Sequence, residues 1–299
     1  MNAIVTRGLS KRYGSRIGVQ DVDLVVPAGA RFGFLGPNGA GKTTLIRLLL
    51  GFMRPSAGSA MVFDLDCWRA SDRIKRGVGY LPGDLRLYPW LNGRSALRMA
   101  SALRGMDLAR AGAELAERFD LDQRVRVREM SRGMRQKLGL VLAMAHRPRL
   151  LVLDEPASGL DPIMQEVLAG MLRDHAARGN TVFFSSHSLR EVEQTCDRVA
   201  IVREGRIVVH EPLETLRQRC PREVTIEFAA PAESLVPPPF LRVIERRETR
   251  WIGQLSGDAA PLLEWLRGRA IRDLIIAPPD LEVIFREHYA NAKPEGARS

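Results

Sequence analysis

The sequence has few cysteines and no long apolar run. Only Cys67, Cys196 and Cys220 are present among its 299 residues, an odd number with no two close together in the chain. This usage is expected of a protein in a reducing cytoplasm, where disulfides are rare. The longest apolar runs, such as residues 138–145, fall far short of the roughly 18 residues that a membrane-spanning helix needs. The first residues lack the apolar core of a signal peptide, so we expect neither a spanning helix nor a signal peptide.

Basic residues outnumber acidic ones by 45 to 35, which gives a formal net charge of +10. An excess of this kind attracts nucleic acid or anionic lipid headgroups. The basic residues are mostly arginines, however, and they are scattered along the whole chain with acids between them. We interpret the charge as a compositional habit of the source genome, with some contribution near a membrane, and it does not identify the partner. An apolar content of 45% is ample for a core, and the length suggests about two domains.

The most informative feature is the run Gly-Pro-Asn-Gly-Ala-Gly-Lys-Thr-Thr at residues 36–44, which contains the phosphate-binding pattern G-x-x-x-x-G-K-[ST]. The apolar run before it, at 30–35, predicts a buried strand, and the run from the lysine onward, at 42–52, predicts a helix. This strand–loop–helix order is the context that the pattern requires. The sequence therefore predicts a binding site for a nucleoside triphosphate.

Each part of this loop has a chemical task. The glycines Gly36, Gly39 and Gly41 permit backbone geometries that are closed to other residues, so successive N–H groups can point at phosphate oxygens. The helix that begins at Lys42 adds the positive end of its dipole, and the lysine reaches the β- and γ-phosphates. The Thr43 hydroxyl is placed to bind Mg²⁺. The expected nucleotide contacts of the loop are Gly36, Pro37, Asn38, Gly39, Ala40, Gly41, Lys42, Thr43 and Thr44.

A second apolar strand ends in two acids. Residues 150–156 read Leu-Leu-Val-Leu-Asp-Glu-Pro, and a strand of the same sheet would deliver Asp154 to the Mg²⁺ shell. Glu155, one residue beyond, would face the space where the attacking water must lie. An Asp-Glu pair at the end of a strand is a weak indication by itself. Its weight comes from its partnership with the phosphate loop.

Between these two motifs, residues 130–138 read Met-Ser-Arg-Gly-Met-Arg-Gln-Lys-Leu, and Ser131 is a natural N-cap for the helix that follows. Alone, this run indicates no more than a capped helix. In this order, however, the motifs resemble those of the ATP-binding subunits of ABC transporters, where a Leu-Ser-Gly-Gly-Gln signature lies shortly before the acidic strand. The chain keeps the serine and the second glycine, Gly133. The other three positions are Met130, Arg132 and Met134.

The resemblance covers roughly residues 3–220 and implies roles for three further side chains. Asp161, in Ser-Gly-Leu-Asp, matches the D-loop of the family, and His187 matches its switch histidine. Tyr13, in Lys-Arg-Tyr-Gly, matches the aromatic residue that stacks on adenine. Without the other motifs of the family, a histidine or a tyrosine is more often a surface or packing residue. In the family the signature faces the nucleotide of a second chain, and the contacts that the resemblance adds on that side are Ser131, Gly133, Met134 and Asp161.

The chain departs from the family after the apolar strand at residues 78–82. Most members place a glutamine there, which touches Mg²⁺ and the attacking water and communicates with the membrane partner. Here the position is Gly83, which has no side chain to offer. Asp84, one residue on, carries a hard carboxylate oxygen of the kind that Mg²⁺ prefers, so one hypothesis makes it a metal ligand. The alternative is that Asp84 only caps the helix or turn that follows.

The pattern of elements predicts an α/β fold, with a P-loop ATPase core of the ABC type, a helical insertion and a small C-terminal α+β domain. Helical signals dominate the insertion, notably at 94–104 and 109–119. The segment 85–91 is rich in large apolar groups where the family forms its groove for the membrane subunit. The alternative is that Tyr88 and Trp90 merely pack the insertion.

The character of the chain changes near residue 221. Strand signals follow at 224–228, twice within 241–256 and at 271–276, and helical signals at 261–267 and 281–289. No catalytic constellation is visible there. The expected domains are an ABC-type ATP-binding domain at 1–220 with its insertion at about 84–149, an accessory or regulatory domain at 221–290 and a disordered tail at 291–299.

The resemblance implies an ATPase that uses ATP and Mg²⁺ and powers a transporter. Two chains would sandwich two ATP molecules head to tail. Lys42 would hold the phosphates, Glu155 would polarise the attacking water and His187 would steady the γ-phosphate, since phosphoryl transfer needs positioning more than covalent chemistry. The ending at 275–285 resembles that of bacterial exporter-type ATPases, including drug and antibiotic-resistance pumps. We therefore expect export of a drug, antibiotic, lipid or similar compound.

The expected partners are a separate polytopic membrane subunit and a second ATPase chain, in a homodimer or a paired assembly. The chain is expected in the cytoplasm at the inner face of the cell membrane, and nucleic acid is not an expected partner. The alternative is a soluble ABC ATPase that acts on ribosomes or nucleic acid. Ribosome-acting members usually carry two ATP cassettes and DNA-repair members insert long coiled coils, whereas this chain has one phosphate loop and no sustained heptads. A P-loop kinase would not need the signature, D-loop and switch histidine together.

Overall fold

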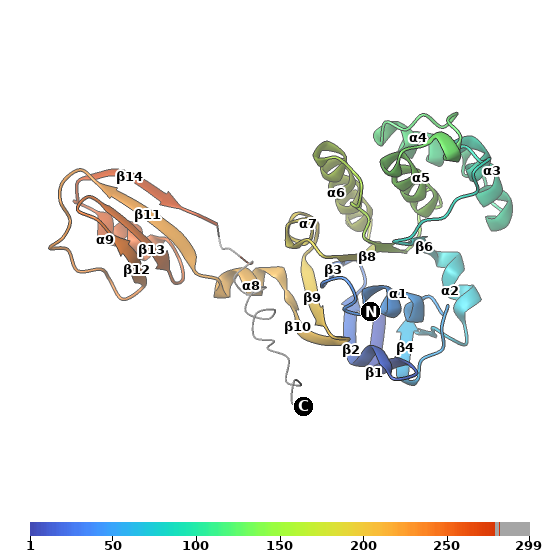
Figure 1. The fold of residues 1–299 in the computed structure, drawn as a ribbon, viewed down its shortest axis with the longest axis horizontal. Helices are drawn as coiled ribbons and strands as arrows, with labels where there is room; N and C mark the ends of the chain where they lie inside the picture. The colour runs from blue at the N-terminus through green and yellow to red at the C-terminus, as the bar shows by residue number, and fades with distance from the viewer. Residues whose placement is uncertain (279–280, 282–299) are drawn as a thin grey trace, which may run out of the picture. The chain divides into compact units, whose positions relative to one another are not determined.

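A computed structural model describes residues 1–278 and 281, and the chain divides into two compact units, Met1–Glu211 and Pro212–Ser299 (Figure 1). The sequence placed this division later, after residue 220. Strand β10 (Arg206–Pro212) ends at the division because a proline has no N–H for a further ladder hydrogen bond. Helix α8 (Leu213–Arg219) follows and therefore belongs to the second unit. In the described part of the chain, no helix is both long enough and apolar enough to cross a membrane.

A largely parallel sheet forms the centre of the first unit. Its strands are, in spatial order, β10, β9 (Arg198–Arg203), β3 (Arg31–Leu35), β8 (Thr181–Ser186), β7 (Leu150–Asp154) and β6 (Val78–Leu81). The four inner pairings from β9 to β6 are parallel. Strands β7 and β8 are buried along their whole length, as expected for inner strands covered on both faces. The carboxyl ends of β3, β7 and β8 therefore meet at one edge of the sheet, where ligands bind in open α/β sheets.

A second, antiparallel sheet completes the first unit. Its strands are, in order, β2 (Arg16–Pro27), β1 (Asn2–Tyr13), β4 (Ala57–Val62) and β5 (Leu65–Asp66). Helix α1 (Lys42–Leu49) contacts β2 and β4 of this sheet and β7 of the parallel sheet, so it lies between the two sheets. The helix is shorter than the sequence predicted. Gly51 ends it with a left-handed φ of 63°, in a place where a Cβ atom would lie 2.2 Å from the carbonyl oxygen of Cys67.

Helices fill the region between β6 and β7. They are α3 (Gly93–Arg104), α4 (Ala109–Arg118), the 3₁₀ turn η1 (Val127–Glu129) and α5 (Arg132–Met144). Helices α3 and α4 agree with the helical signals in the sequence, and Asn92 and Ser95 form a capping box at the start of α3. Helix α5 packs against α3, α4 and strand β6, so it joins the insertion to the sheet. The other helices described in this unit are α2 (Ser71–Gly77), α6 (Pro162–Ala177) and α7 (Leu189–Thr195).

The second unit is a four-stranded antiparallel sheet with one helix packed into its core. The strands are, in order, β12 (Leu241–Arg246), β13 (Arg250–Leu255), β11 (Arg222–Phe228) and β14 (Ile271–Ile276), and the helix is α9 (Ala260–Leu266). Trp251, fully buried, packs with Phe228 and Leu262 in this core. All four strands and α9 lie where the sequence predicted them. The predicted helix at 281–289, apart from its first residue, and the tail at 291–299 lie outside the described residues.

Candidate nucleotide-binding site

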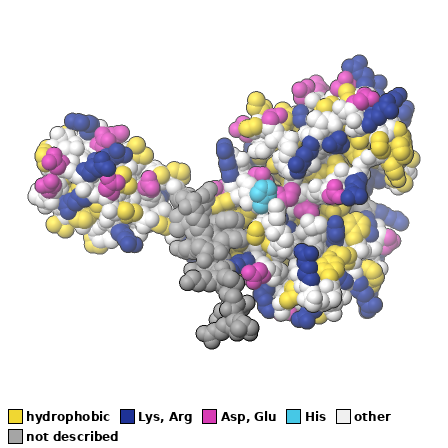
Figure 2. Space-filling view, viewed as in Figure 1, with side chains coloured by type: hydrophobic (Ala, Val, Ile, Leu, Met, Phe, Trp, Pro, Cys, Tyr) yellow, Lys and Arg dark blue, Asp and Glu magenta, His cyan; other side chains and the backbone are white. Residues whose placement is uncertain are grey.

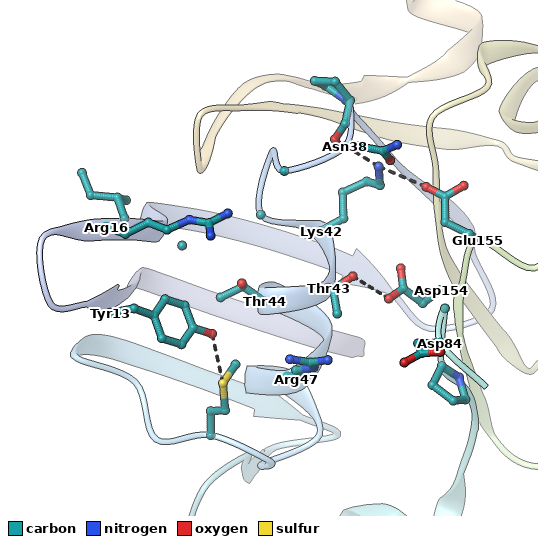
Figure 3. A pocket seen from close by; sticks show the side chains of 18 of the residues that line it. Tyr13, Arg16, Asn38, Lys42, Thr43, Thr44, Arg47, Asp84, Asp154 and Glu155 are labelled. Carbon is teal, nitrogen blue, oxygen red and sulfur yellow. Dashed lines mark hydrogen bonds and ion pairs between the residues drawn. The ribbon is translucent and has the colours of Figure 1, made fainter. Parts of the chain in front are cut away.

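A cavity of about 1070 Å³ opens at the carboxyl edge of the parallel sheet, around the loop between β3 and α1 (Figure 3). Figure 3 shows Lys42, Asp154 and Glu155 converging at one end of this cavity, with Tyr13 and Arg16 at the other. The predicted site residues that line it are Tyr13, Pro37, Asn38, Gly39, Gly41, Lys42, Thr43, Thr44, Asp84, Asp154 and Glu155. The phosphate loop and the acidic strand end are thus brought together.

The glycines of the loop serve two different purposes. Gly39 and Gly41 have φ values of 84° and 105°, which residues with a Cβ atom rarely adopt. Gly36 does not have a positive φ, so the expectation that it supplies such a geometry was wrong. A Cβ atom there would lie 2.6 Å from the carbonyl oxygen of Val202 on β9. Gly36 is therefore needed because the loop packs closely against the neighbouring strand.

The Lys42 side chain is nearly buried, with 6% of it exposed. Its Nζ donates hydrogen bonds to the carbonyl oxygens of Gly36, at 2.6 Å, and Pro37, at 3.2 Å. Nζ also lies 3.1 Å from Oε1 of Glu155. This ion pair lacks hydrogen-bond geometry, so Oε1 is a buried oxygen without a hydrogen-bond donor. The loop therefore presents one fixed positive charge directly opposite the acid that follows Asp154.

Asp154 is anchored on both of its carboxylate oxygens. Thr43 Oγ1 donates to Oδ2 at 2.7 Å, and the hydroxyl of Ser185, on the neighbouring strand β8, donates to Oδ1. Asp154 is buried, so these bonds fix its orientation. A hydroxyl and a carboxylate are hard oxygen donors that fit Mg²⁺, which typically uses one or two carboxylates together with substrate phosphates and water. In agreement with that habit, residues 1–278 and 281 contain no cluster of three acids, histidines or cysteines that could hold a metal alone.

Glu155 occupies a strained backbone position. Its φ is 51°, in the left-handed region that non-glycine residues rarely adopt. The backbone N–H of Glu155 is held by Ser185, through its carbonyl and hydroxyl oxygens at 3.2 Å each. The side chain turns back toward the cavity, where Oε2 lies 2.7 Å from Nδ1 of His187. Lys42, Glu155 and His187 thus form a continuous chain of charged and polar groups.

The segment that carries His187 is stabilised by hydrogen bonds of the neighbouring residue Ser186. Ser186 donates its hydroxyl to Oε2 of Glu191, at 2.6 Å, and accepts the N–H of Ser188 at 2.9 Å. Burial raises the pKa of the Glu191 carboxyl, and the nearby Glu155 carboxylate raises it further, against the hydrogen bond from Ser186 and the charge of His187. The histidine itself is 59% exposed and is not part of the cavity lining. It is placed to act on a group that enters beside Glu155.

Tyr13 lies at the opposite end of the cavity and is 43% exposed. Its hydroxyl contacts Sδ of Met53 at 3.0 Å, and the Lys11 ammonium lies 5.7 Å from the ring centroid. Gly18 leaves room beside the ring, because a Cβ atom there would lie 2.8 Å from Cε2 of Tyr13. The geometry leaves an aromatic surface at the cavity mouth, and stacking on adenine stays a prediction.

At the departure from the family pattern, Gly83 lies directly over Asp154. A Cβ atom at Gly83 would be 3.2 Å from Asp154 Oδ2, so a side chain there would lie against the Asp154 carboxylate. The Asp84 carboxylate lines the cavity, but it is 75% exposed and bonds to Arg86 at 2.8 and 3.0 Å. Asp84 does not cap the helix that follows, because the next helix is α3 and its cap is Asn92. The other half of the alternative, a cap on the turn that follows, stays a prediction.

Four of the predicted contacts lie elsewhere. Ser131, Gly133, Met134 and Asp161 line a second cavity of about 370 Å³, which shares no lining residue with the first. As predicted, Ser131 caps α5, accepting the N–H of Met134 at 3.1 Å. Asp161 caps α6 in the same way. One chain therefore presents two separate cavities that are lined by predicted site residues.

Sequence reasoning missed several side chains of the first cavity, among them Arg47, Arg16 and Tyr80. Arg47 lies one helical turn after Thr43 on α1, and that i+4 spacing could have revealed it. Arg16 stands at the start of β2, where the chain returns from Tyr13. Tyr80 lies beside Asp154, and burial, aided by that carboxylate and opposed by Arg47, raises its pKa to about 12. Arg47 adds positive charge near Thr43, whereas Arg16 adds it at the Tyr13 end of the cavity.

The fold and this site define a P-loop ATPase. The family model described as ABC transporter matches residues 19–158. The bacitracin transport ATP-binding protein BcrA of Bacillus licheniformis is 37% identical over 72% of each chain. The Nod factor export ATP-binding protein I of Rhizobium etli is 32% identical over 95% of this chain and 92% of its own. A solved ATP-binding subunit of an ABC transporter superposes with a TM-score of 0.68 at 29% identity, over 72% of this chain and 92% of that one.

The chain belongs to the ABC transporter family, as an ATP-binding subunit of the exporter type. A further relative of this type is the daunorubicin resistance ATP-binding protein DrrA3 of Streptomyces coeruleorubidus, 37% identical over 72% of this chain and 70% of its own. The prediction of an ATPase that serves a transporter is thereby confirmed, and the alternative of a protein acting on ribosomes or nucleic acid is not supported.

The Asp84 hypothesis makes a measurable prediction. We expect Asp84→Ala to raise the Mg²⁺ concentration needed for half-maximal ATPase activity by a factor of roughly 2 to 5, the size of an exposed charge interaction. Arg86→Ala is the matched control, because it frees the Asp84 carboxylate from its ion pair and should not raise the requirement. A Mg²⁺ titration of ATPase activity measures both. An unchanged requirement in Asp84→Ala would leave γ-phosphate sensing to His187 and the second cavity.

Proposed function

We propose that this chain powers the export of a drug, antibiotic, lipid or similar compound through a separate polytopic membrane subunit, at the cytoplasmic face of the cell membrane. The names of its relatives support this proposal, because they refer to bacitracin transport, daunorubicin resistance and Nod factor export. Nucleic acid is not part of the proposal. On the face shown in Figure 2, basic and acidic side chains are interspersed over both units, without the continuous basic stripe that nucleic-acid binding requires.

The observation that carries the proposed mechanism is the separation of the two half-sites. The first cavity holds Lys42, Asp154 and Glu155, and the second holds Ser131 and Gly133. Neither is complete for a nucleotide that must be held on both sides. Two chains arranged head to tail, as a homodimer or as a pair with a related ATPase subunit, would place the second half-site of each over the nucleotide of the other. ATP then holds the two chains together.

Within such a site, this chain's own residues perform the reaction by positioning and charge. Lys42 and the loop amides hold the β- and γ-phosphates, and Thr43 and Asp154 would hold Mg²⁺. When bound, Mg²⁺ neutralises phosphate charge. Glu155 accepts a hydrogen bond from the attacking water and draws its proton, and His187, beside it, steadies the γ-phosphate. Cleavage removes the phosphate that joins the half-sites, and the chains separate.

The membrane subunit would dock on an apolar surface of the insertion. Tyr88 and Trp90 stack on each other with ring centroids 4.7 Å apart, and they are 56% and 68% exposed. The alternative that these rings merely pack the insertion is not supported by their exposure. Aromatic side chains are enriched where proteins meet, since they bury large areas at low entropic cost. For the second unit, which has a core of its own, we propose a role in bracing or regulating the paired chains.

The docking surface can be tested by co-purification. We expect the tagged chain, extracted from membranes in detergent, to retain a polytopic membrane protein. The double change Tyr88→Ala with Trp90→Ala should reduce this recovery by roughly tenfold or more, because interface hot spots are enriched in Trp and Tyr and cost about 2 kcal/mol or more when truncated. Trp68→Ala is the matched control, as an exposed aromatic outside the insertion. Quantitative mass spectrometry measures the recovery. Equal recovery from the double variant would place the docking surface elsewhere, and loss of any membrane partner from the wild-type chain would contradict the proposed function itself.

A further inference from the structure

Arg132 stands in the signature where the family places its first glycine, and it is the first residue of α5. The side chain is exposed and lines the second cavity. Glycine would offer only its backbone at this position, whereas arginine adds a charged group with five N–H donors. The chain has therefore exchanged a flexible, neutral position for a cation in the half-site that faces a second chain.

The Arg132 guanidinium is held in place by the loop that follows Glu155. Its Nη2 donates to Oγ of Ser158 at 2.6 Å. The stem of the side chain lies along Gly159, where a Cβ atom would come within 3.2 to 3.5 Å of Cγ, Cδ and Nε of Arg132. This one hydrogen bond uses one N–H of five, so the remaining donors can face a ligand. A planar guanidinium fixed in this way is suited to bidentate contact with a phosphate.

The charge of the second cavity favours an anion. Arg132 and Lys137 both line it. The one acid of the lining, Asp161, has Oδ1 engaged by the N–H of Met164 at 2.9 Å, as the cap of α6. The residues at the start of α5 line the same cavity, so the positive end of a 13-residue helix lies beside it. Two cations against one capping carboxylate leave a net positive half-site.

The same loop connects this half-site to the catalytic acid. Gln136, one turn further along α5, is buried and donates Nε2 to the carbonyl oxygens of Glu155, at 3.2 Å, and Pro156, at 2.9 Å. Arg132 and Gln136 thus hold the segment from Glu155 to Ser158 at both of its ends. These contacts link the second cavity to the backbone of Glu155.

We propose that Arg132 binds the terminal phosphate of an ATP molecule held by a second chain, and that Ser158 positions the guanidinium for this contact. The proposal rests on the head-to-tail arrangement proposed above and assigns to it a residue that the family signature does not contain. By the same geometry, phosphate binding in the second cavity orders the segment that begins at Glu155. Each chain then becomes competent for hydrolysis only when its own second cavity is occupied.

The test uses the full chain with Glu155→Gln, so that ATP is retained, and measures the dimer dissociation constant with Mg²⁺ and ATP by sedimentation velocity. We expect Arg132→Gln to raise this constant about 100-fold, because each of two sites loses a hydrogen bond to a charged group, about tenfold per site. Arg132→Lys retains the charge without the fork and should give an intermediate value. Ser158→Ala should raise the dimer dissociation constant less than Arg132→Gln does. Ser158→Thr keeps a hydroxyl and should give the dissociation constant of the parent. The parent dimer should also weaken more steeply with added salt than the Arg132→Gln dimer.

Arg135→Gln is the matched control, because Arg135 lies on the same helix but bonds to the Met130 carbonyl oxygen and is not part of the cavity lining. It should leave the dimer constant within about threefold of the parent, as expected of surface changes. Binding of ATP to the monomer should be the same in all these chains. A parent-like dimer constant in Arg132→Gln would overturn the Arg132 proposal while leaving the two-chain arrangement intact. A Glu155→Gln parent that stays monomeric with ATP would instead overturn the arrangement, and the Arg132 proposal with it.

Discussion

Glu155→Gln should abolish ATP turnover and leave ATP binding intact. Glutamine keeps the shape of the side chain but removes the carboxylate that lies 3.1 Å from Lys42 and 2.7 Å from His187. Loss of a positioned general base typically lowers the rate by a factor of about 10² to 10⁴. Binding is spared because the neutral amide no longer competes with phosphate for Lys42. Steady-state phosphate release and equilibrium binding of ATP measure the two effects separately.

The locked state gives this variant a second readout. With ATP bound but not cleaved, the Glu155→Gln chain should elute as a stable dimer in size-exclusion chromatography, whereas the wild-type chain should dimerise only transiently. Glu114→Gln, which removes an exposed acid on α4 that lines neither nucleotide cavity, should hydrolyse ATP like wild type. Substantial hydrolysis by Glu155→Gln would reject Glu155 as the catalytic base.

Lys42→Ala should weaken nucleotide binding itself. The change deletes the only charged side chain of the phosphate loop, and it leaves Oε1 of Glu155 buried without its ion pair. Hydrogen bonds to charged groups contribute about 1.5 to 3 kcal/mol, so the dissociation constant for ATP should rise roughly 10- to 100-fold. Titration calorimetry on the monomer measures this rise. Ser131→Ala is the contrasting variant, since it should spare binding to the monomer and block ATP-driven dimerisation.

Mixing these two variants tests whether the site is shared. A heterodimer of Lys42→Ala and Ser131→Ala chains contains one intact composite site and one doubly defective site. We expect the mixture to form more dimer with ATP than either variant alone, measured by sedimentation. Wild-type affinity for ATP in Lys42→Ala would exclude the assigned role of Lys42, and a mixture with no more dimer than its components would contradict sharing of the site between chains.

The parts of the site that could be predicted are those fixed by local sequence. The phosphate loop can be recognised from its local pattern, in which Gly41 and Lys42 follow the strand at a fixed spacing. Asp154 can be recognised from its place at the end of an apolar strand. The parallel pairing of β7 and β8 then places Ser185 beside Asp154, which no local pattern shows. The role of Gly36 was misjudged for the same reason. Glycine is needed there because a Cβ atom would clash with Val202, which lies far along the chain.

Other departures also have tertiary causes. Helix α1 ends earlier than predicted because Gly51 packs closely against the backbone carbonyl of Cys67. The bond between Arg86 and Asp84 depends on side-chain conformations that a spacing of two residues does not specify. The elements of the second unit were predicted well, because their alternation and turn residues are local, whereas the position of the division itself depends on which contacts α8 makes.

At Glu155, whose backbone is left-handed, selection for stability and selection for catalysis favour different residues. A residue with φ of 51° destabilises the fold by about 1 to 3 kcal/mol unless it is glycine. A glycine would relax the turn, yet it would remove the acid to which we assign the activation of water. Selection for catalysis thus maintains a local weakness that selection for stability alone would erase. The cost is offset by the bonds that the Glu155 N–H donates to Ser185 and by those that Gln136 donates to the carbonyl oxygens of Glu155 and Pro156. These bonds would lose much of their value in a descendant that no longer hydrolyses ATP.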